Sequence, residues 1–298
     1  MSSDHDWRRL YPFESHELRI DGQRYHYLDE GQGEPLLLVH GNPTWSFYWR
    51  ELVQALRGQH RVIAVDHIGC GLSDKPADYS YTLARHTQNL QKLIQSLDLQ
   101  QVTLLAHDWG GAIGLGAAVA EPERFSRLVL FNTGAFRAPH MPWRIRICRT
   151  PVLGSLAVRG LNAFARAALW MATARPEGLS PAVQAGLLAP YSSWANRVAI
   201  QRFVEDIPMR PEHPSYRDLL AVEQGLERLA DRPVLLVWGM QDWCFTPNFL
   251  QRFTEFFPAA EVCRLENAGH YVIEDAPGEV VDAVQGFLLR HPLEAARR

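Results

Sequence analysis

The sequence predicts an α/β protein with a mostly parallel, doubly wound sheet and a helical insertion. Short apolar runs typical of buried strands alternate with stretches at helical spacing. The alternation stops after Phe131 and resumes at Val234, and the chain between them is rich in Arg, Pro, Ala and Trp. With 298 residues, 47% of them hydrophobic, the chain can build one large core with an insertion. We therefore expect a core domain over 1–134 and 230–298 and a helical cap domain over 135–229.

The expected elements follow in the order that this fold class requires. Two antiparallel strands joined at the turn Asp21-Gly22 come first, and buried strands then alternate with helices. The carboxyl ends of the strands form the ligand crevice in a doubly wound sheet, so the insertion is expected to roof that crevice. Strands are expected at 16–20, 24–29, 36–39, 61–66, 102–105, 128–131, 234–238 and 261–265, and helices from about 46–48, over 83–97 and from 112.

The stretch Ala106-His107-Asp108-Trp109-Gly110-Gly111 joins a strand to a helix. A sharp turn of this kind, with small residues at 106 and 110 that let strand and helix approach, is typical of a nucleophile elbow. Its central residue is Asp108, where a serine esterase has Ser. A carboxylate can displace a leaving group from carbon and leave an ester on the enzyme. An Asp at a strand end can also simply cap the next helix. Motifs elsewhere in the chain must decide between a nucleophile and a helix cap.

Two further strand ends carry the partners that such a nucleophile needs. Asp242 follows the strand at 234–238, and His270 lies on the loop after the last strand. Either residue alone could be a loop residue without a catalytic role, but the order nucleophile, acid, histidine is that of α/β-hydrolases. The other position for the acid, after the strand at 128–131, holds Asn132, which favours Asp242. We expect Asp108, Asp242 and His270 to be catalytic.

An anion site is expected beside the nucleophile. Backbone N–H groups at a helix N-terminus favour negative charge, and the indole of Trp109 can only donate. Asn42 offers an amide from the loop after the strand at 36–39. We expect Asn42 and Trp109 to bind the departing group of the substrate, a halide or an oxyanion, although core packing and a turn would also explain them.

Composition excludes several classes of function. A formal charge of −3 gives no reason to expect a nucleic-acid partner. Residues 1–11 lack the apolar segment of a signal peptide, the apolar region 151–174 is interrupted by Arg159 and Arg166, and the tail at 294–298 is expected to be frayed. We expect a cytoplasmic protein with no transmembrane segment, no metal and no cofactor. The cysteines, without CxxC or metal spacing, are expected to be free thiols: Cys70, Cys148, Cys244 and Cys263.

These motifs together carry a family resemblance. The segments 40–45, 107–111, 239–242 and 268–270, which read HGNPTW, HDWGG, GMQD and AGH, resemble the haloalkane dehalogenase branch of the α/β-hydrolases over nearly the whole chain. The resemblance implies that Asp108 is the nucleophile, Asp242 the acid, His270 the base, and Asn42 with Trp109 the leaving-group pair. Cap segments at 141–144, 189–197 and 202–208 are similar to the β-lactone decarboxylases (OleB type) of bacterial long-chain olefin biosynthesis.

That resemblance implies conversion of a cis-3,4-dialkyl-oxetan-2-one to a cis-alkene and carbon dioxide. Whether Asp108 attacks the sp³ ring carbon or the lactone carbonyl stays open. A haloalkane dehalogenase that hydrolyses 1-haloalkanes through an alkyl ester is the alternative. An epoxide hydrolase ranks third, because the cap offers only Tyr191 and Tyr216 as the two tyrosines that it needs. A receptor without turnover would lack a triad member, and none is missing.

The resemblance also implies a hydrophobic small-molecule substrate with long alkyl chains. The expected partners are a multi-enzyme olefin-biosynthesis assembly or further copies of the chain. Arg144, Arg146 and Arg149 form a basic patch that is either solvated or contacts a partner enzyme or a carboxylate. Candidates for lining alkyl channels, unless they simply pack between helices, are Leu153, Leu156, Leu161, Phe164, Leu169 and Met171.

Overall fold

The centre of the protein is an eight-stranded sheet, in a computed structural model that describes residues 6–293. Its order is β1-β2-β4-β3-β5-β6-β7-β8; the β1–β2 and β2–β4 pairs are antiparallel and the others parallel. The mostly parallel sheet that the sequence predicts is therefore confirmed. The strands are β1 (Ser15–Ile20), β2 (Gln23–Glu30), β3 (Pro35–Val39), β4 (Arg61–Val65), β5 (Val102–Asp108), β6 (Phe125–Thr133), β7 (Val234–Gly239) and β8 (Glu261–Leu265).

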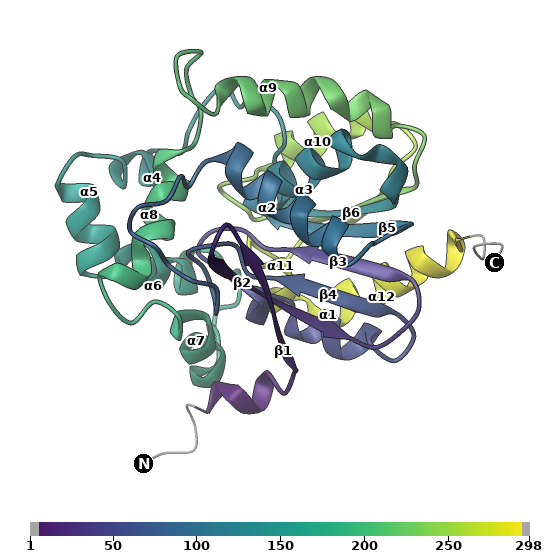
Figure 1. Cartoon of the computed structure of the whole chain (residues 1–298), viewed down its shortest axis with the longest axis horizontal. Coiled ribbons are helices and arrows are strands. Elements are labelled where there is room, and N and C mark those ends of the chain that lie inside the picture. The colour runs from purple at the N-terminus through teal and green to yellow at the C-terminus, as the bar shows by residue number, and fades with distance from the viewer. Residues whose placement is uncertain (1–5, 294–298) are drawn as a thin grey trace.

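Helices cover both faces of the sheet (Figure 1). One layer contains α2 (Leu83–Ser96), α3 (Trp109–Ala120), α9 (Tyr216–Gly225) and α10 (Pro247–Phe256), and the other contains α1 (Arg50–Leu56), α11 (Val272–Asp275) and α12 (Pro277–Arg290). Short 3₁₀ helices occur at η2 (Trp7–Leu10), η3 (Ser46–Trp49), η4 (Pro122–Arg124), η6 (Ala195–Arg197) and η7 (Leu226–Leu229), and η5 (Leu156–Gly160) is a π-helix.

Successive strand residues alternate between two apolar cores. On β3, Leu37 and Val39 face the core under α2 and α3, while Leu36 and Leu38 face the core under α1 and α12. A strand buried on both faces has no polar side chain to mark its period, which is why these runs are continuously apolar in sequence. β5 extends beyond its predicted end to Asp108, because the polar His107 and Asp108 continue the buried strand.

The insertion between β6 and β7 contributes helices at one end of the sheet (Figure 1). These are α4 (Trp143–Ile147), α5 (Leu153–Ser155), α6 (Ala163–Met171), α7 (Pro181–Leu188) and α8 (Val198–Glu205). The later helix α9 packs on α2 and α3 instead, so its Leu219 and Val222 belong to the core under those two helices.

Some expectations concern the surface and the ends of the chain. The four cysteines are free thiols, as predicted. No helix within residues 6–293 combines the length and apolar character needed to cross a bilayer. The tail at 294–298 and the first five residues of the segment 1–11 lie outside the described residues.

Candidate active site

The turn from β5 into α3 holds Asp108 in a strained conformation. Its φ of 53° and ψ of −126° are rare for a residue with a side chain, and they aim the carboxylate away from the strand. A Cβ on Gly110 would lie 1.9 Å from the carbonyl oxygen of Val39, so the strand and helix can approach only with glycine there. This is the close approach for which the sequence predicts a small residue at 110.

The structure brings Asp108, His270 and Asp242 together from three strand ends. His270 Nε2 lies 3.7 Å from Asp108 Oδ2, and His270 Nδ1 lies 2.8 Å from Asp242 Oδ2. All three side chains are buried, so water competes little with these contacts. Asp242 therefore fixes the imidazole with its Nε2 directed toward Asp108.

Asn132 has a function that the sequence pattern does not reveal. It occupies the alternative acid position after β6, and its Nδ2 donates to Asp242 Oδ2 at 3.0 Å. Its other bonds, to the backbone N–H and C=O of Gly239, tie the end of β6 to the end of β7. The backbone N–H of Cys244 donates to the second oxygen of Asp242 at 2.7 Å. Both carboxylate oxygens of Asp242 are thus hydrogen-bonded.

The ring of His270 also packs against two neighbouring aromatic rings. The His107 ring lies 4.5 Å from it, and Phe245 stacks on it with centroids 5.6 Å apart and planes 19° from parallel. His107 Nε2 is 2.9 Å from the His270 carbonyl oxygen. His107 is next to Asp108 in sequence, but it packs on the imidazole of His270 and does not line the cavity described below.

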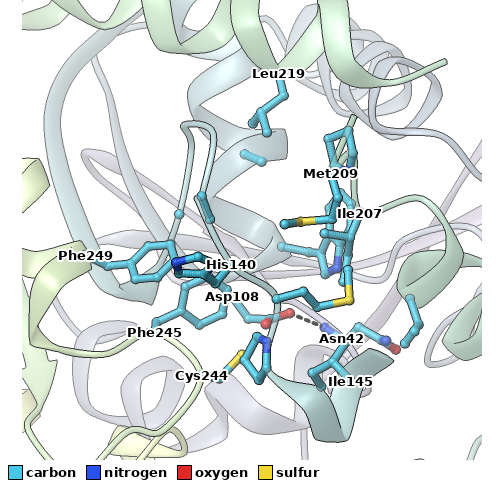
Figure 2. A pocket seen from close by; sticks show the side chains of 18 of the residues that line it. Asn42, Asp108, His140, Ile145, Ile207, Met209, Leu219, Cys244, Phe245 and Phe249 are labelled. Carbon is cyan, nitrogen blue, oxygen red and sulfur yellow. Dashed lines mark hydrogen bonds between the residues drawn. The ribbon is translucent and has the colours of Figure 1, made fainter. Parts of the chain in front are cut away.

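Asn42 and Trp109 both contact Asp108 through their backbone N–H groups. The backbone N–H of Asn42 donates to Asp108 Oδ1 at 2.6 Å (Figure 2), and the backbone N–H of Trp109 also bonds to the Asp108 carboxylate. The Asn42 amide Nδ2 donates to the carbonyl of Ile200 on α8 at 3.1 Å, which connects this loop to the insertion. The second N–H of this amide has no acceptor within residues 6–293.

The pKa values of Asp108 and His270 are both raised, the first by burial and the second by neighbouring charge. Burial raises the pKa of Asp108, against the opposing effects of His270 and the backbone amides. Burial lowers the pKa of His270, but the neighbouring Asp242 and Asp108 carboxylates outweigh it, and the net pKa is raised above 6.5. Perturbation of a buried acid and its adjacent base is typical of a catalytic site.

A mostly apolar cavity lies beside Asp108, and it has two arms that meet there. Both arms share Asn42, Asp108, Ile145, Phe164 and Cys244. The first arm, seen in Figure 2, extends under α2, α9 and α10, and its further lining includes Leu83, Trp109, Phe136, Ala138, Leu219 and Phe249. The second arm extends under η5 and α6, and its further lining includes Arg144, Ile147, Ala157, Ala168, Met171 and Tyr271.

The two arms lie toward opposite faces of the sheet. Leu83 and Leu219 of the first arm belong to the core under α2 and α3. In the second arm, Tyr271 belongs to the core under α1 and α12, and Ala168 packs against that core. The arms also differ in the size of their side chains, since the first has more phenylalanines and the second more alanines.

The expected alkyl-channel residues have different positions. Phe164 lines both arms and Met171 lines the second, in agreement with the expectation. Leu169 instead packs in the core. The prediction is wrong for three residues that face solvent with 51–74% exposure, because an apolar period marks a helix face without saying what covers it: Leu153, Leu156 and Leu161.

Neither Tyr191 nor Tyr216 lines either arm. Tyr191 is fully buried and its hydroxyl donates to the Thr44 carbonyl at 3.2 Å. The two hydroxyl donors that an epoxide oxygen needs are therefore not supplied by these residues. Within residues 6–293 no three His, Cys, Asp or Glu side chains are grouped so that they could hold a metal ion.

Comparison with known proteins agrees with this geometry. A family model described as the alpha/beta hydrolase fold matches residues 34–145 and 184–277. The chain belongs to this family, and relatives that it resembles include two kinds of enzyme.

A cis-3-alkyl-4-alkyloxetan-2-one decarboxylase from Shewanella oneidensis is 45% identical over 94% of this chain and 89% of its own length. A haloalkane dehalogenase from Mycobacterium bovis is 32% identical over 93% and 95%. The crystal structure of haloalkane dehalogenase DatA from Agrobacterium tumefaciens has a TM-score of 0.84 and 28% identity over 93% of this chain and 96% of that one. The chain thus lies in the haloalkane dehalogenase branch and is more similar to the decarboxylase than to this dehalogenase.

Proposed function

We propose that the protein is a β-lactone decarboxylase, which converts a cis-3,4-dialkyl-oxetan-2-one to a cis-alkene and carbon dioxide. The observation that carries the proposal is the cavity with two apolar arms that meet at Asp108. This substrate has one alkyl chain on each of two adjacent ring carbons, so a ring at the junction places one chain in each arm. A 1-haloalkane has one chain and would fill one arm. The 45% identity with an oxetanone decarboxylase supports the same choice.

In the first step Asp108 Oδ2 attacks ring carbon C4. The bond between C4 and the ring oxygen breaks, its electron pair leaves with that oxygen, and strain in the four-membered ring is released. The products are an alkyl ester of Asp108 and a carboxylate on C3. Asn42 and Trp109, beside the nucleophile, supply the donors for this new carboxylate.

In the second step the carboxylate leaves C3 as carbon dioxide. Its bonding electrons form the C3–C4 double bond, and the ester bond from C4 to Asp108 breaks to regenerate the carboxylate. Inversion at C4 followed by anti elimination keeps the alkyl groups cis. His270, held by Asp242 and 3.7 Å from Asp108 Oδ2, stabilises the returning charge. No water is consumed. Attack at the carbonyl instead would leave an oxygen on C4 that still has to depart.

The test compares a dialkyl β-lactone with a 1-bromoalkane in water enriched in heavy oxygen. The lactone is expected to give alkene and carbon dioxide in equal amounts, with Asp108 unlabelled in a peptide mass spectrum. A dehalogenase cycle labels Asp108, because water attacks the carbonyl of its ester. Halide release without alkene formation, or label in Asp108 after lactone turnover, would contradict the proposal.

The Asp108→Asn variant provides the control for this test. Removing the nucleophile should lower the rate of alkene formation by about 10⁴-fold or more. The substitution keeps the size of the side chain, so circular dichroism should show an unchanged fold. Unchanged turnover would rule out Asp108 as the nucleophile.

Three broader assignments complete the proposal. The core domain comprises 1–134 and 230–298 and the cap 135–229, although α9 packs with the core. The protein acts in the cytoplasm without a cofactor. Its partners are the enzymes that make the β-lactone, assembled with it, or further copies of itself.

A further inference from the structure

The exposed apolar side chains of this protein are concentrated on the insertion. Nine of the twelve large hydrophobic side chains that are exposed among residues 6–293 lie between Trp143 and Trp194. We call this the cap face; its apolar members, 36–74% exposed, are Trp143, Ile147, Val152, Leu153, Leu156, Leu161, Trp170, Met171 and Trp194. A concentration of this size marks an interaction surface.

The same segment is strongly basic. Residues 137–202 contain nine arginines and one acid, Glu177, which gives a formal charge of +8 in a chain whose total is −3. Arg144, Arg146 and Arg166 are exposed and make no ion pair with a carboxylate of residues 6–293. Arg137, Arg175 and Arg202 pair with Glu223, Glu177 and Glu205, so the positive charge of this segment is compensated only in part.

Arginines and tryptophans lie beside one another on this face. The Arg144 guanidinium lies 5.4 Å from the Trp143 ring and 5.1 Å from the Trp243 ring, and Arg159 lies 4.6 Å from the Trp194 ring. Side chains with an apolar body and a polar end are favoured where a bilayer meets water.

The second arm of the cavity opens on the cap face. Arg144, Ile147 and Met171 line that arm and are themselves exposed. Trp243 joins them through a hydrogen bond from its indole to the Met171 carbonyl at 2.6 Å. In Figure 1, α4, α5 and α6 stand together at the end of the molecule away from the C-terminal end of α12.

We propose that the cap face docks on the surface of an anionic lipid bilayer and presents the mouth of the second arm to it. The positive charge complements acidic headgroups, and the exposed leucines and tryptophans enter the interfacial layer. The choice of a lipid surface over a protein partner also rests on the proposed function, because a dialkyl substrate and its alkene product partition into a bilayer. Binding is peripheral.

The test uses the full-length protein and sedimentation with vesicles in the absence of substrate. Binding is expected to vesicles that contain phosphatidylglycerol, to weaken in high salt, and to be much weaker to phosphatidylcholine alone. Arg166→Gln should reduce the partition coefficient about fivefold. Leu153→Ser with Leu161→Ser should reduce it about tenfold or more.

Matched controls come from exposed residues outside the cap face. Leu289→Ser on α12, where the leucine is 78% exposed, and Arg264→Gln on β8 should leave vesicle binding unchanged. Lactone turnover in detergent micelles should be equal in every one of these variants, which shows that each is folded.

Two results would overturn the docking proposal. One is wild-type protein that does not bind the acidic vesicles at low salt, or cap-face variants that bind like the wild type. The other is a dimer in solution that Leu153→Ser with Leu161→Ser dissociates, which would assign the face to a second copy. Vesicle binding without lactone turnover would contradict the proposed function alone, and turnover without vesicle binding would contradict docking alone.

Discussion

Asp242 is held from three sides, by His270, by Asn132 and by the backbone N–H of Cys244. A carboxylate with this many donors keeps one orientation, and it transmits that orientation to the imidazole. Asp108 has no comparable contact with His270, since the 3.7 Å between Oδ2 and Nε2 is beyond hydrogen-bond distance. The site therefore leaves Asp108 Oδ2 available to a substrate.

Replacing Asp242 with Asn should lower the pKa of His270. Burial depresses this pKa and the Asp242 and Asp108 carboxylates raise it, so removing one carboxylate moves it downward. The titration of the His270 ring protons by NMR measures the shift. Turnover should fall about 10²- to 10⁴-fold, because the imidazole also loses its orientation. An unchanged pKa would contradict the assignment of Asp242 as its partner.

At the scale of elements, the junction of β5 and α3 fixes the position of Asp108. The close approach of Gly110 to β3 leaves no room for a side chain. The loop after β3 carries Asn42, so the same approach places its backbone N–H against Asp108. The packing of α3 on β3 therefore also sets the position of Asn42 relative to Asp108.

Gly110→Ala should destabilise the protein. Its Cβ would meet the Val39 carbonyl at 1.9 Å, and overpacking of this kind costs about 1–3 kcal/mol of the free energy of unfolding. Urea-induced unfolding measures the loss. The matched control is Gly278→Ala in α12, where no atom lies within 4 Å of the added Cβ, and which should be neutral or stabilising.

The two arms can be tested separately with the same substitution. Ala138→Leu narrows the first arm and Ala168→Leu narrows the second. Each variant should lose activity toward lactones with a long chain on one ring carbon and keep it when that chain is short. Assays with unsymmetrical lactones should give opposite preferences for the two variants. Identical chain-length profiles would mean that both chains occupy one arm.

For the whole molecule, buried neutral histidines should make stability depend on pH. Burial lowers the pKa of His40, His67, His86 and His107, that of His86 to about 3. As the pH falls below 6.5 the unfolded chain takes up protons that these folded residues do not, so the free energy of unfolding falls. His270, with its raised pKa, acts in the opposite direction.

His86→Phe isolates this effect. Neither ring nitrogen of His86 has a hydrogen-bond partner within residues 6–293, and the ring stacks on Phe203 at 4.6 Å. The variant should be about 1–3 kcal/mol more stable at pH 7. Between about pH 6 and 4 the free energy of unfolding should fall with decreasing pH in both proteins. The slope for the variant should be smaller than that of the wild type by about 1.4 kcal/mol per pH unit. Urea unfolding at several pH values checks both expectations; His16→Phe, on the edge strand β1, is the control.

The strands and the order of the candidate triad could be predicted from sequence because each leaves a local signal. A continuous apolar run marks a buried strand, and the polar residue that ends it marks the edge where the site lies. The bond from Asn132 to Asp242 joins residues 110 positions apart, and no local pattern reports it. The solvent exposure of Leu153 and Leu161 likewise depends on the absence of a covering element, which helical spacing does not encode.

The cavity with two unlike arms also has a handedness. With Asp108 in line with the C4–O bond, placing the C4 chain in one arm and the C3 chain in the other determines on which side of the ring plane both chains lie. The mirror image of a cis-disubstituted ring, held with the same C4–O bond in line with Asp108, can bring its chains to that side only by moving C3 to the other side of this line. Because the first arm has more phenylalanines and the second more alanines, we expect the two enantiomers of the lactone to react at different rates.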